Sequence, residues 1–345
     1  MPSIQAGDIG DVVIGILDDL GRLKWTDLTT DLQDYPAVNQ LMKKKKVDFL
    51  GGTNIQWNVM VDHNNSARFV GLGSVDVVNQ QDVMKTAEIP WRHVTANWSI
   101  EERVIAMNRG DEYRVIDLVK TARISGMVAL VKLLEERFWQ KPTDSTDTVN
   151  IFGIPYWCVP SATEGFNGTN PSGFTSGAGG LSSTTYPRWA NYTARYVSVT
   201  KTDLLRKLRR AMTKTQFKAP VDMPQYGNSI SRGLYTNYDV VGPCEELLEA
   251  QNDNLGNDLA SKDGKCVFRG VPLTDVPYLD DGDTTNPVYG LDWNTMKPVC
   301  MRGEFMKEMG PKIAPRQHRT LEWFVDISMN LECRDRRKQF VINTA

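Results

Sequence analysis

The residue types that most often carry catalysis or bind metals are few in this sequence and widely spaced. The three His residues, His63, His93 and His318, lie far apart, and no two of the five Cys form a Cys-x-x-Cys pair. Structural zinc sites and dithiol redox sites depend on such close spacing. Three His would suffice for a Ser-His-Asp set, but no motif places a nucleophile near one of them. No zinc, redox or other cofactor site is therefore predicted.

Carboxylates could act as acid–base pairs or as calcium ligands, but their spacing fits neither role. Three pairs are adjacent in sequence, Glu101-Glu102, Glu135-Glu136 and Glu245-Glu246. Adjacent side chains point in different directions on a helix or strand, so these pairs are predicted to be solvated. The acidic segments 252–258 and 280–283 lack the spacing of an EF-hand loop. We therefore predict no catalytic residue and no metal site, and the chain is not expected to be an enzyme.

Glycine-rich segments could cradle phosphate groups. The sequence contains neither GxxxxGK[ST] nor GxSxG, and Gly71-Leu72-Gly73 lacks the third glycine of a dinucleotide-binding loop. The run GFTSGAGG at 173–180 does not follow a clear buried strand. This run is predicted to be a surface loop.

Composition indicates a soluble globular chain with enough length for a large core. It has 345 residues, 41% hydrophobic and 24% charged, and a formal net charge of −2. That charge excludes a globally basic nucleic-acid binder, although local basic patches remain compatible with it. The odd Cys count favours buried thiols in a reducing compartment over a disulfide framework. No signal peptide is expected, and no apolar run approaches the roughly 20 residues that span a membrane.

The elements that must position any site are unusually long. In 321–333, LEWFVDISMNLEC, odd positions are apolar or Cys and even positions are mostly polar, which predicts a strand with one buried face. At about 3.3 Å per residue this strand spans roughly 43 Å. Apolar residues at spacings of three and four predict a helix over 111–140, roughly 45 Å long at about 1.5 Å per residue. Two such elements side by side predict an elongated layer.

A hairpin is predicted over 54–78. Ile55, Trp57 and Val59 alternate with polar residues, and a polar turn leads to a return strand through 69–72 and 75–77. A lone ribbon is only marginally stable, so a second chain is expected to cover Trp57, Val59 and Phe69.

The remaining sequence predicts a short N-terminal helix and a mixed α/β region. Opposite parities of the apolar residues in 87–100 predict one strand with a bulge near His93. The other predictions are helices over 9–20, 201–215 and 239–255, a strand with a turn in 150–160, and short strands near 266–268, 287–291 and 298–301.

Three basic clusters are candidate contact sites. We expect Lys43, Lys44, Lys45 and Lys46 to be a solvated helix end or to meet an acidic neighbouring subunit. For Arg334, Arg336, Arg337 and Lys338, solvent is favoured over either contact alone, and pairing between subunits is slightly favoured over contact with DNA phosphates. Arg206, Lys207, Arg209 and Arg210 lie opposite the apolar stripe of helix 201–215, which favours a solvated face and leaves contact with DNA at an inner surface as the alternative.

The order of these elements, together with several motifs, resembles the major capsid proteins of tailed bacteriophages, the Hong Kong 97-type fold. The resemblance extends over essentially the whole chain. The motifs are GIPYW (153–157), NDNLGNDLA (252–260), FRGVP (268–272), PVYGLDW (287–293) and NLECRDRR (330–337).

The resemblance implies an α+β fold with four parts. These are an N-terminal arm (1–46), an extended E-loop hairpin (47–88), a peripheral domain (89–150 and 305–345) with a long spine helix, and a mixed α/β axial domain (151–304).

It also implies a structural protein of the virion that assembles in the host cytoplasm. Pentamers and hexamers of the chain would form an icosahedral shell around double-stranded DNA. A separate scaffolding protein is expected, because no long charged helical segment is apparent near the N-terminus; a portal and a decoration protein are further partners. The alternatives are an encapsulin-like compartment, a tail- or portal-associated virion protein, and a small-oligomer hydrolase.

Overall fold

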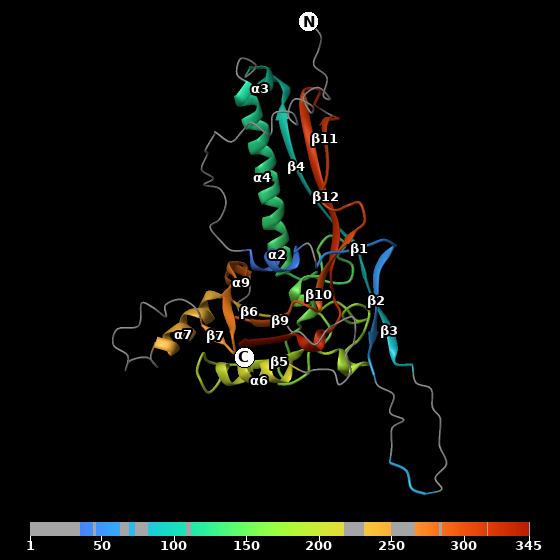
Figure 1. Cartoon of the computed structure of the whole chain (residues 1–345), viewed down its shortest axis with the longest axis vertical. Coiled ribbons are helices and arrows are strands. Elements are labelled where there is room, and N and C mark those ends of the chain that lie inside the picture. The colour runs from blue at the N-terminus through green and yellow to red at the C-terminus, as the bar shows by residue number, and fades with distance from the viewer. Residues whose placement is uncertain are drawn as a thin grey trace.

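The structure is a computed structural model that describes residues 35–43, 46–62, 69–72, 82–107, 112–216, 231–249, 266–282, 285–315 and 317–344. The predicted helix 9–20, together with Lys44 and Lys45, lies outside these residues. Figure 1 shows an elongated layer, a rounder body below it, and a two-stranded hairpin beside that body.

The elongated layer is a five-stranded sheet with one long helix beside it (Figure 1). Its strands are β1 (Asp48–Leu50), β4 (Arg92–Glu101), β10 (Met296–Met301), β11 (Lys307–Ile313) and β12 (Thr320–Cys333). Strand β12 has 14 residues and pairs along one side with β4 and along the other with β11 and then β10, all antiparallel. Helix α4 (Glu112–Phe138) has 27 residues and packs against β4. The predicted long strand and long helix are therefore confirmed.

Over the first half of β12, the alternation of apolar and polar residues gives one buried face, as predicted. Leu321, Trp323 and Val325 are buried in one cluster with residues of β4 and α4, while the residues between them are half-exposed. From Ser328 onward every residue of β12 is buried, because the strand passes into the rounder body. Close contact between α4 and β4 requires Gly126, since a Cβ there would lie 2.6 Å from the Trp98 ring.

The rounder body contains a six-stranded sheet in the order β5-β13-β9-β6-β8-β7. Its strands are β5 (Tyr192–Tyr196), β6 (Arg232–Thr236), β7 (Val267–Phe268), β8 (Val271–Asp275), β9 (Val288–Asp292) and β13 (Phe340–Thr344). One face packs on the buried residues of α6 (Leu204–Lys214) and α7 (Tyr238–Glu249). The predicted helices 201–215 and 239–255 are thus confirmed within the described residues.

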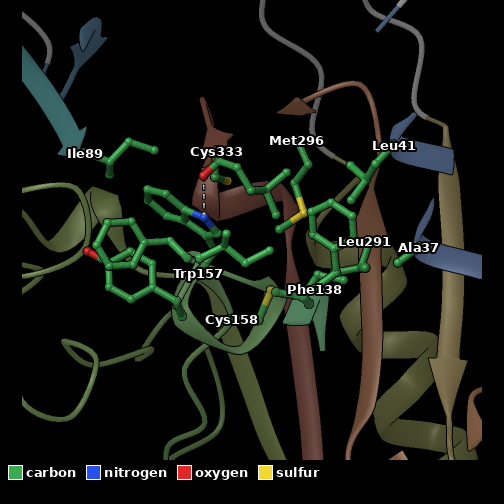
Figure 2. Packing of buried hydrophobic residues seen from close by; sticks show 14 of the residues in the cluster. Ala37, Leu41, Ile89, Phe138, Trp157, Cys158, Leu291, Met296 and Cys333 are labelled. Carbon is green, nitrogen blue, oxygen red and sulfur yellow. Dashed lines mark hydrogen bonds between the residues drawn. The ribbon is translucent and has the colours of Figure 1, made fainter. Parts of the chain in front are cut away.

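A single large core joins the second sheet to the rest of the molecule. Figure 2 shows residues from both sheets, from the hairpin and from the end of α4 packed around Trp157. The Trp157 ring is fully buried, and its Nε1–H donates to the Leu331 carbonyl oxygen of β12 at 3.1 Å. The layer and the body therefore share one hydrophobic interior. All five Cys are buried free thiols, as predicted.

The hairpin is formed by β2 (Asn54–Met60) and β3 (Met84–Pro90), paired antiparallel from Asn54↔Pro90 to Met60↔Met84. The return strand is therefore 84–90, and the predicted return through 69–72 and 75–77 is wrong for the described part, 69–72. The predicted strand 87–100 is divided at Trp91 between β3 and β4, which belong to different sheets. This division explains the change of parity that had been attributed to a bulge near His93.

One further prediction differs from the structure. The segment predicted as a strand with a turn contains a short helix, α5 (Ile154–Trp157), preceded by Gly153, where a Cβ would lie 2.1 Å from the Gln140 carbonyl oxygen. Strand β10 pairs within the elongated sheet and β13 within the second sheet, and the division into four parts stays a prediction. The other short elements are α2 (Pro36–Leu41), α3 (Glu102–Met107), α9 (Pro277–Gly282), η1 (Pro187–Trp189) and η2 (Arg336–Lys338).

Candidate assembly surfaces

The inner face of the hairpin is covered by the same chain. Ile55, Trp57 and Val59 point toward the body while the residues between them are exposed. Trp57 is only 9% exposed, and its ring meets the Trp157 ring edge-on with centroids 6.0 Å apart. The prediction that a second chain must cover Trp57 and Val59 is therefore wrong. These side chains pack in the core of their own chain, against residues that include Trp157. Trp157 lies 100 residues away in sequence, so the alternation pattern of the hairpin could not predict this contact.

Beyond the paired strands, the described segment 69–72 lies far from the rest of the chain (Figure 1). Phe69 and Leu72 are fully exposed, and Val70 is 58% exposed. Leaving such apolar side chains in water forfeits the roughly 1.5–3 kcal/mol that burial of each would contribute. This apolar tip is thus a candidate contact surface, and the contact predicted for Phe69 stays a prediction.

The described lysines of the 43–46 run have different surroundings. The Lys43 ammonium is exposed and donates to Gln40 Oε1 at 2.8 Å. The Lys46 ammonium lies 5.8 Å from the centre of the Trp293 ring. Burial, followed by repulsion from Lys43, lowers the pKa of Lys46, and the charge of Asp292 opposes this shift. Contact of Lys43 with an acidic neighbour stays a prediction.

The three arginines after β12 point to three separate places. Arg334 pairs within the chain, with Glu332 at 2.5 Å and Asp48 at 3.1 Å. The Arg337 guanidinium lies 4.5 Å from the centre of the Phe166 ring. Both side chains are only half-buried, so their contact with neighbouring subunits stays a prediction.

Arg336 is fully buried, so the prediction that it contacts another subunit is wrong. Its Nε donates to the Trp157 carbonyl oxygen at 2.9 Å, and its other nitrogens donate to three further oxygens. These acceptors are Trp189 O at 3.1 Å, Thr169 O at 3.3 Å and Asn191 Oδ1 at 3.1 Å. Burial lowers the pKa of Arg336. The side chain acts as an internal crosslink between α5, the 169–191 segment and the end of β12.

The four cations predicted on the outer side of helix 201–215 do lie there. Arg206, Arg209 and Arg210 are exposed, and Lys207 is half-buried. Lys207 pairs with Asp203 at 2.5 Å, and Arg210 pairs with Glu164 at 3.0 Å. In the single chain this face of the helix is therefore largely exposed to solvent, and its contact with DNA stays a prediction.

A buried carboxylate escaped the sequence analysis. Glu135 is fully buried, so the prediction of a solvated Glu135-Glu136 pair is wrong for its first member. Its Oε1 accepts from Ala37 N at 3.0 Å and from Trp139 Nε1 at 2.7 Å, and its Oε2 accepts from Val38 N at 2.7 Å. It thereby satisfies two N–H groups in the first turn of α2, which have no partner within the helix. A usable signal existed, because position 135 falls on the apolar stripe of α4.

Burial raises the pKa of Glu135, and its three hydrogen bonds oppose the shift. The carboxylate therefore fastens the segment that precedes β1 to the long helix, and its charge is screened by N–H dipoles.

A second apolar surface lies at the edge strand β1. Phe49 is 45% exposed and Leu50 37% exposed, and the Phe49 ring meets the Phe305 ring edge-on at 5.7 Å. Strand β1 pairs only with β10, so its outer edge carries unpaired backbone groups among the described residues. An open edge of this kind can pair with another chain.

Searches for a metal site or a membrane span within the described ranges found neither. They contain no group of three His, Cys, Asp or Glu side chains able to hold a metal ion. No helix there is long and apolar enough to cross a bilayer.

Comparison with known proteins identifies the architecture. Neither a protein-family model nor a curated protein matches the sequence. Among solved structures, the capsid asymmetric unit of cyanophage A-1(L) is similar with a TM-score of 0.62 and 14% identity, over 95% of this chain and 98% of that one.

The capsid of a native GTA particle is similar with a TM-score of 0.57 and 11% identity, over 96% and 98% of the two chains. The capsid of Myoviridae phage XM1 follows with 0.53 and 10%, over 95% and 98%. Identities this low establish the fold alone, and they do so from one end of each chain to the other. The chain therefore has the fold of phage capsid proteins, the Hong Kong 97-type fold.

Proposed function

We propose that this chain is the major capsid protein of a tailed bacteriophage. Pentamers and hexamers of it form an icosahedral shell around double-stranded DNA. The observation that carries the proposal is the similarity to the cyanophage A-1(L) capsid chain over 95% of this chain and 98% of that one. The role is structural, and the proposal includes no catalytic step.

The shape of the molecule suits a tile in a shell. A long helix beside a long strand makes a wide, thin layer, and the hairpin projects well beyond it (Figure 1). The apolar tip and the apolar edge strand β1 lie on opposite sides of β2 in sequence, and both expose apolar side chains in the single chain. Modest contacts repeated around every subunit stabilise a closed shell strongly, because each contact removes apolar surface from water.

The partners implied by this role are further copies of the chain, genomic DNA, a separate scaffolding protein, a portal and a decoration protein. The virion capsid is the proposed location, with assembly in the cytoplasm of the host. An encapsulin-like compartment would differ by enclosing protein cargo instead of DNA, and a tail-associated protein would form tubes or single rings.

The direct test is to express the chain alone and with candidate scaffolding proteins and to image the products by negative stain. Closed shells or flat hexagonal sheets are expected. Uniform monomers under every condition would contradict the proposal.

Replacing both Phe69 and Leu72 by Ser should block assembly without unfolding the chain. Neither side chain is buried by its own subunit, so folding loses no packing, whereas a contact that buries both loses about 3 kcal/mol or more. We expect the concentration needed for shell formation to rise roughly 100-fold or beyond the measurable range. Light scattering against protein concentration measures the threshold, and circular dichroism checks the fold.

The matched control replaces Val149 and Val197 by Ser, since both are apolar and exposed but lie far from the hairpin tip in sequence. This variant should assemble like the parent chain. An unchanged threshold for the tip variant would show that the tip does not meet a neighbour.

A further inference from the structure

Helix α6 carries an unusually one-sided charge. Five of its residues are cationic and none is acidic, in the sequence LLRKLRRAMTK. Its apolar residues Leu204, Leu205, Leu208, Ala211 and Met212 are all buried against the second sheet. Packing therefore orients the helix, and its cations are held toward the outside. The whole chain has a formal net charge of −2, so this face is a local feature.

Three of the five cations have no partner in the described part of the chain. Lys207 and Arg210 pair with Asp203 and Glu164. The side chains of Arg206, Arg209 and Lys214 are exposed and make neither a hydrogen bond nor an ion pair with any described residue. The helix thus presents positive charge that its own subunit does not neutralise.

The spacing places these charges on one stripe. Residues three or four positions apart lie on the same side of a helix, and Arg206, Arg209, Arg210 and Lys214 follow this interval. At about 1.5 Å per residue the stripe is roughly 12 Å long. Double-stranded DNA carries one phosphate charge per about 1.7 Å of its axis, so a stripe of this length can face several phosphates at once.

The chemistry of the exposed side chains discriminates between partners. The exposed positions of α6 are Arg206, Arg209, Arg210, Thr213 and Lys214, and none of them is apolar or aromatic. A protein interface normally has an apolar or aromatic centre that is poor in Lys. Arg and Lys can also contact guanine edges, but these positions carry none of the amides and carboxylates that read adenine and cytosine and none of the aromatic rings that stack on bases. Charge and hydrogen-bond donors alone suit a phosphate backbone.

We propose that the outer face of α6 binds the phosphate backbone of double-stranded nucleic acid without sequence preference. This inference rests on the proposed function, since it names the part of the chain that meets the enclosed DNA. It predicts that the α6 side of the second sheet faces the interior of the shell. Binding depends on the three unpaired cations, because Lys207 and Arg210 already have carboxylate partners.

The test compares two triple variants of the full chain in its unassembled state. One removes the α6 charges, with Arg206→Gln, Arg209→Gln and Lys214→Gln. The control removes three exposed cations from the elongated sheet and its loops, with Arg302→Gln, Lys312→Gln and Arg319→Gln. Both change the net charge equally, so a nonspecific charge effect appears in both. Thermal melts followed by circular dichroism confirm that each variant folds.

Fluorescence anisotropy measures binding to two unrelated duplexes of about 30 base pairs over a series of salt concentrations. Each neutralised phosphate contributes about 0.9 to the slope of log K against log salt. The α6 variant should therefore have a slope lower by about 2–3 and bind at least about tenfold more weakly at about 0.1 M salt, equally for both duplexes. The control should bind like the parent chain.

Three results would overturn the inference: equal binding by both variants, a clear preference for one duplex, or no binding by the parent chain at low salt. Shell formation, followed separately by negative stain, distinguishes this inference from the proposed function. An α6 variant that binds DNA normally but forms no shells would show that this face meets a second copy. If neither the parent chain nor any variant formed shells, that result would count against the proposed function. The anisotropy measurement would still show whether α6 binds DNA.

Discussion

Replacing Arg336 by Ala is expected to lower the free energy of unfolding by about 4 kcal/mol or more. The guanidinium is fully buried and donates to four oxygens, of which three are backbone carbonyls. Removing the donor takes this partner from three buried carbonyl oxygens, while Asn191 Oδ1 still accepts from Val159 N at 3.2 Å. Each buried unpaired group costs about 1–3 kcal/mol before water or local movement relieves it. The vacated volume adds a cavity cost, because Arg336 is among the largest fully buried side chains.

Urea unfolding of the unassembled chain measures this loss, and the neighbouring Arg337→Ala is the matched control. Arg337 is half-buried and stacks on Phe166, so its removal should cost only about 0.5–1 kcal/mol. A Lys at position 336 should restore little, because an ammonium is a point donor and cannot reach four separated acceptors. Equal, small losses for both Ala variants would mean that Arg336 does not hold these segments together.

Replacing Glu135 by Ala is the second large expected effect, with a loss of about 3 kcal/mol. Its two oxygens accept from two N–H groups of α2 and from the Trp139 indole, at 2.7–3.0 Å. These donors lie at buried or half-buried positions, so they lose hydrogen bonds that water cannot fully replace. Burial of the charge opposes this stabilisation and outweighs the hydrogen bonds in setting the pKa, but removing the carboxyl group still leaves three donors without their acceptor.

The adjacent Glu136→Ala is the control, since the Glu136 carboxylate accepts only an exposed hydrogen bond from Gln140 in the described structure. Its removal should change the unfolding free energy by about 0.5 kcal/mol or less. Hydrogen exchange adds a local readout, because loss of Glu135 should expose the amides of Ala37 and Val38. Unchanged protection there would show that the carboxylate does not fasten α2.

The pKa of Glu135 gives this prediction a second measurable consequence. A raised pKa means that the folded chain binds the proton more tightly than the unfolded chain does. The stability of the wild-type chain relative to Glu135→Gln should therefore be greatest below the ordinary value of 4.5 and decrease as the pH rises through the raised value. A relative stability that instead increased with pH would contradict the raised pKa.

Elements with a sustained period were predicted well from sequence. Alternation in 321–333 and the three-and-four spacing of 111–140 and 204–214 depend only on residues close together in the chain. Short strands were harder. In β13 every residue but the last is buried, so it shows no alternation, and its place between β5 and β9 comes from pairing with residues about 50 to 150 positions away.

For the candidate sites, too, the sequence predicted the residue types but not the surroundings of each side chain. The basic residues that follow β12 looked alike in sequence, yet Arg334 forms ion pairs, Arg336 enters the core and Arg337 lies over an aromatic ring. The turn η2 and the Asp335 side chain, which accepts from Arg337 N, set these directions. Trp57 is similar, because its alternation predicted a buried face but not whether the cover belonged to its own chain or to another.

Local periodicity was thus sufficient for the long helix, the long strand and the amphipathic α6, whereas the fold was inferred from the resemblance of their order and of several motifs to a known family. Only the tertiary structure showed the environments of individual polar and aromatic groups. It showed which cation is enclosed, which carboxylate is buried, and which face of the hairpin is covered by the same chain. The physical reason is distance along the sequence. A helical or strand period is set by neighbours within a few residues, whereas the environments of Trp57, Glu135 and Arg336 are made by segments about 100 residues or more away.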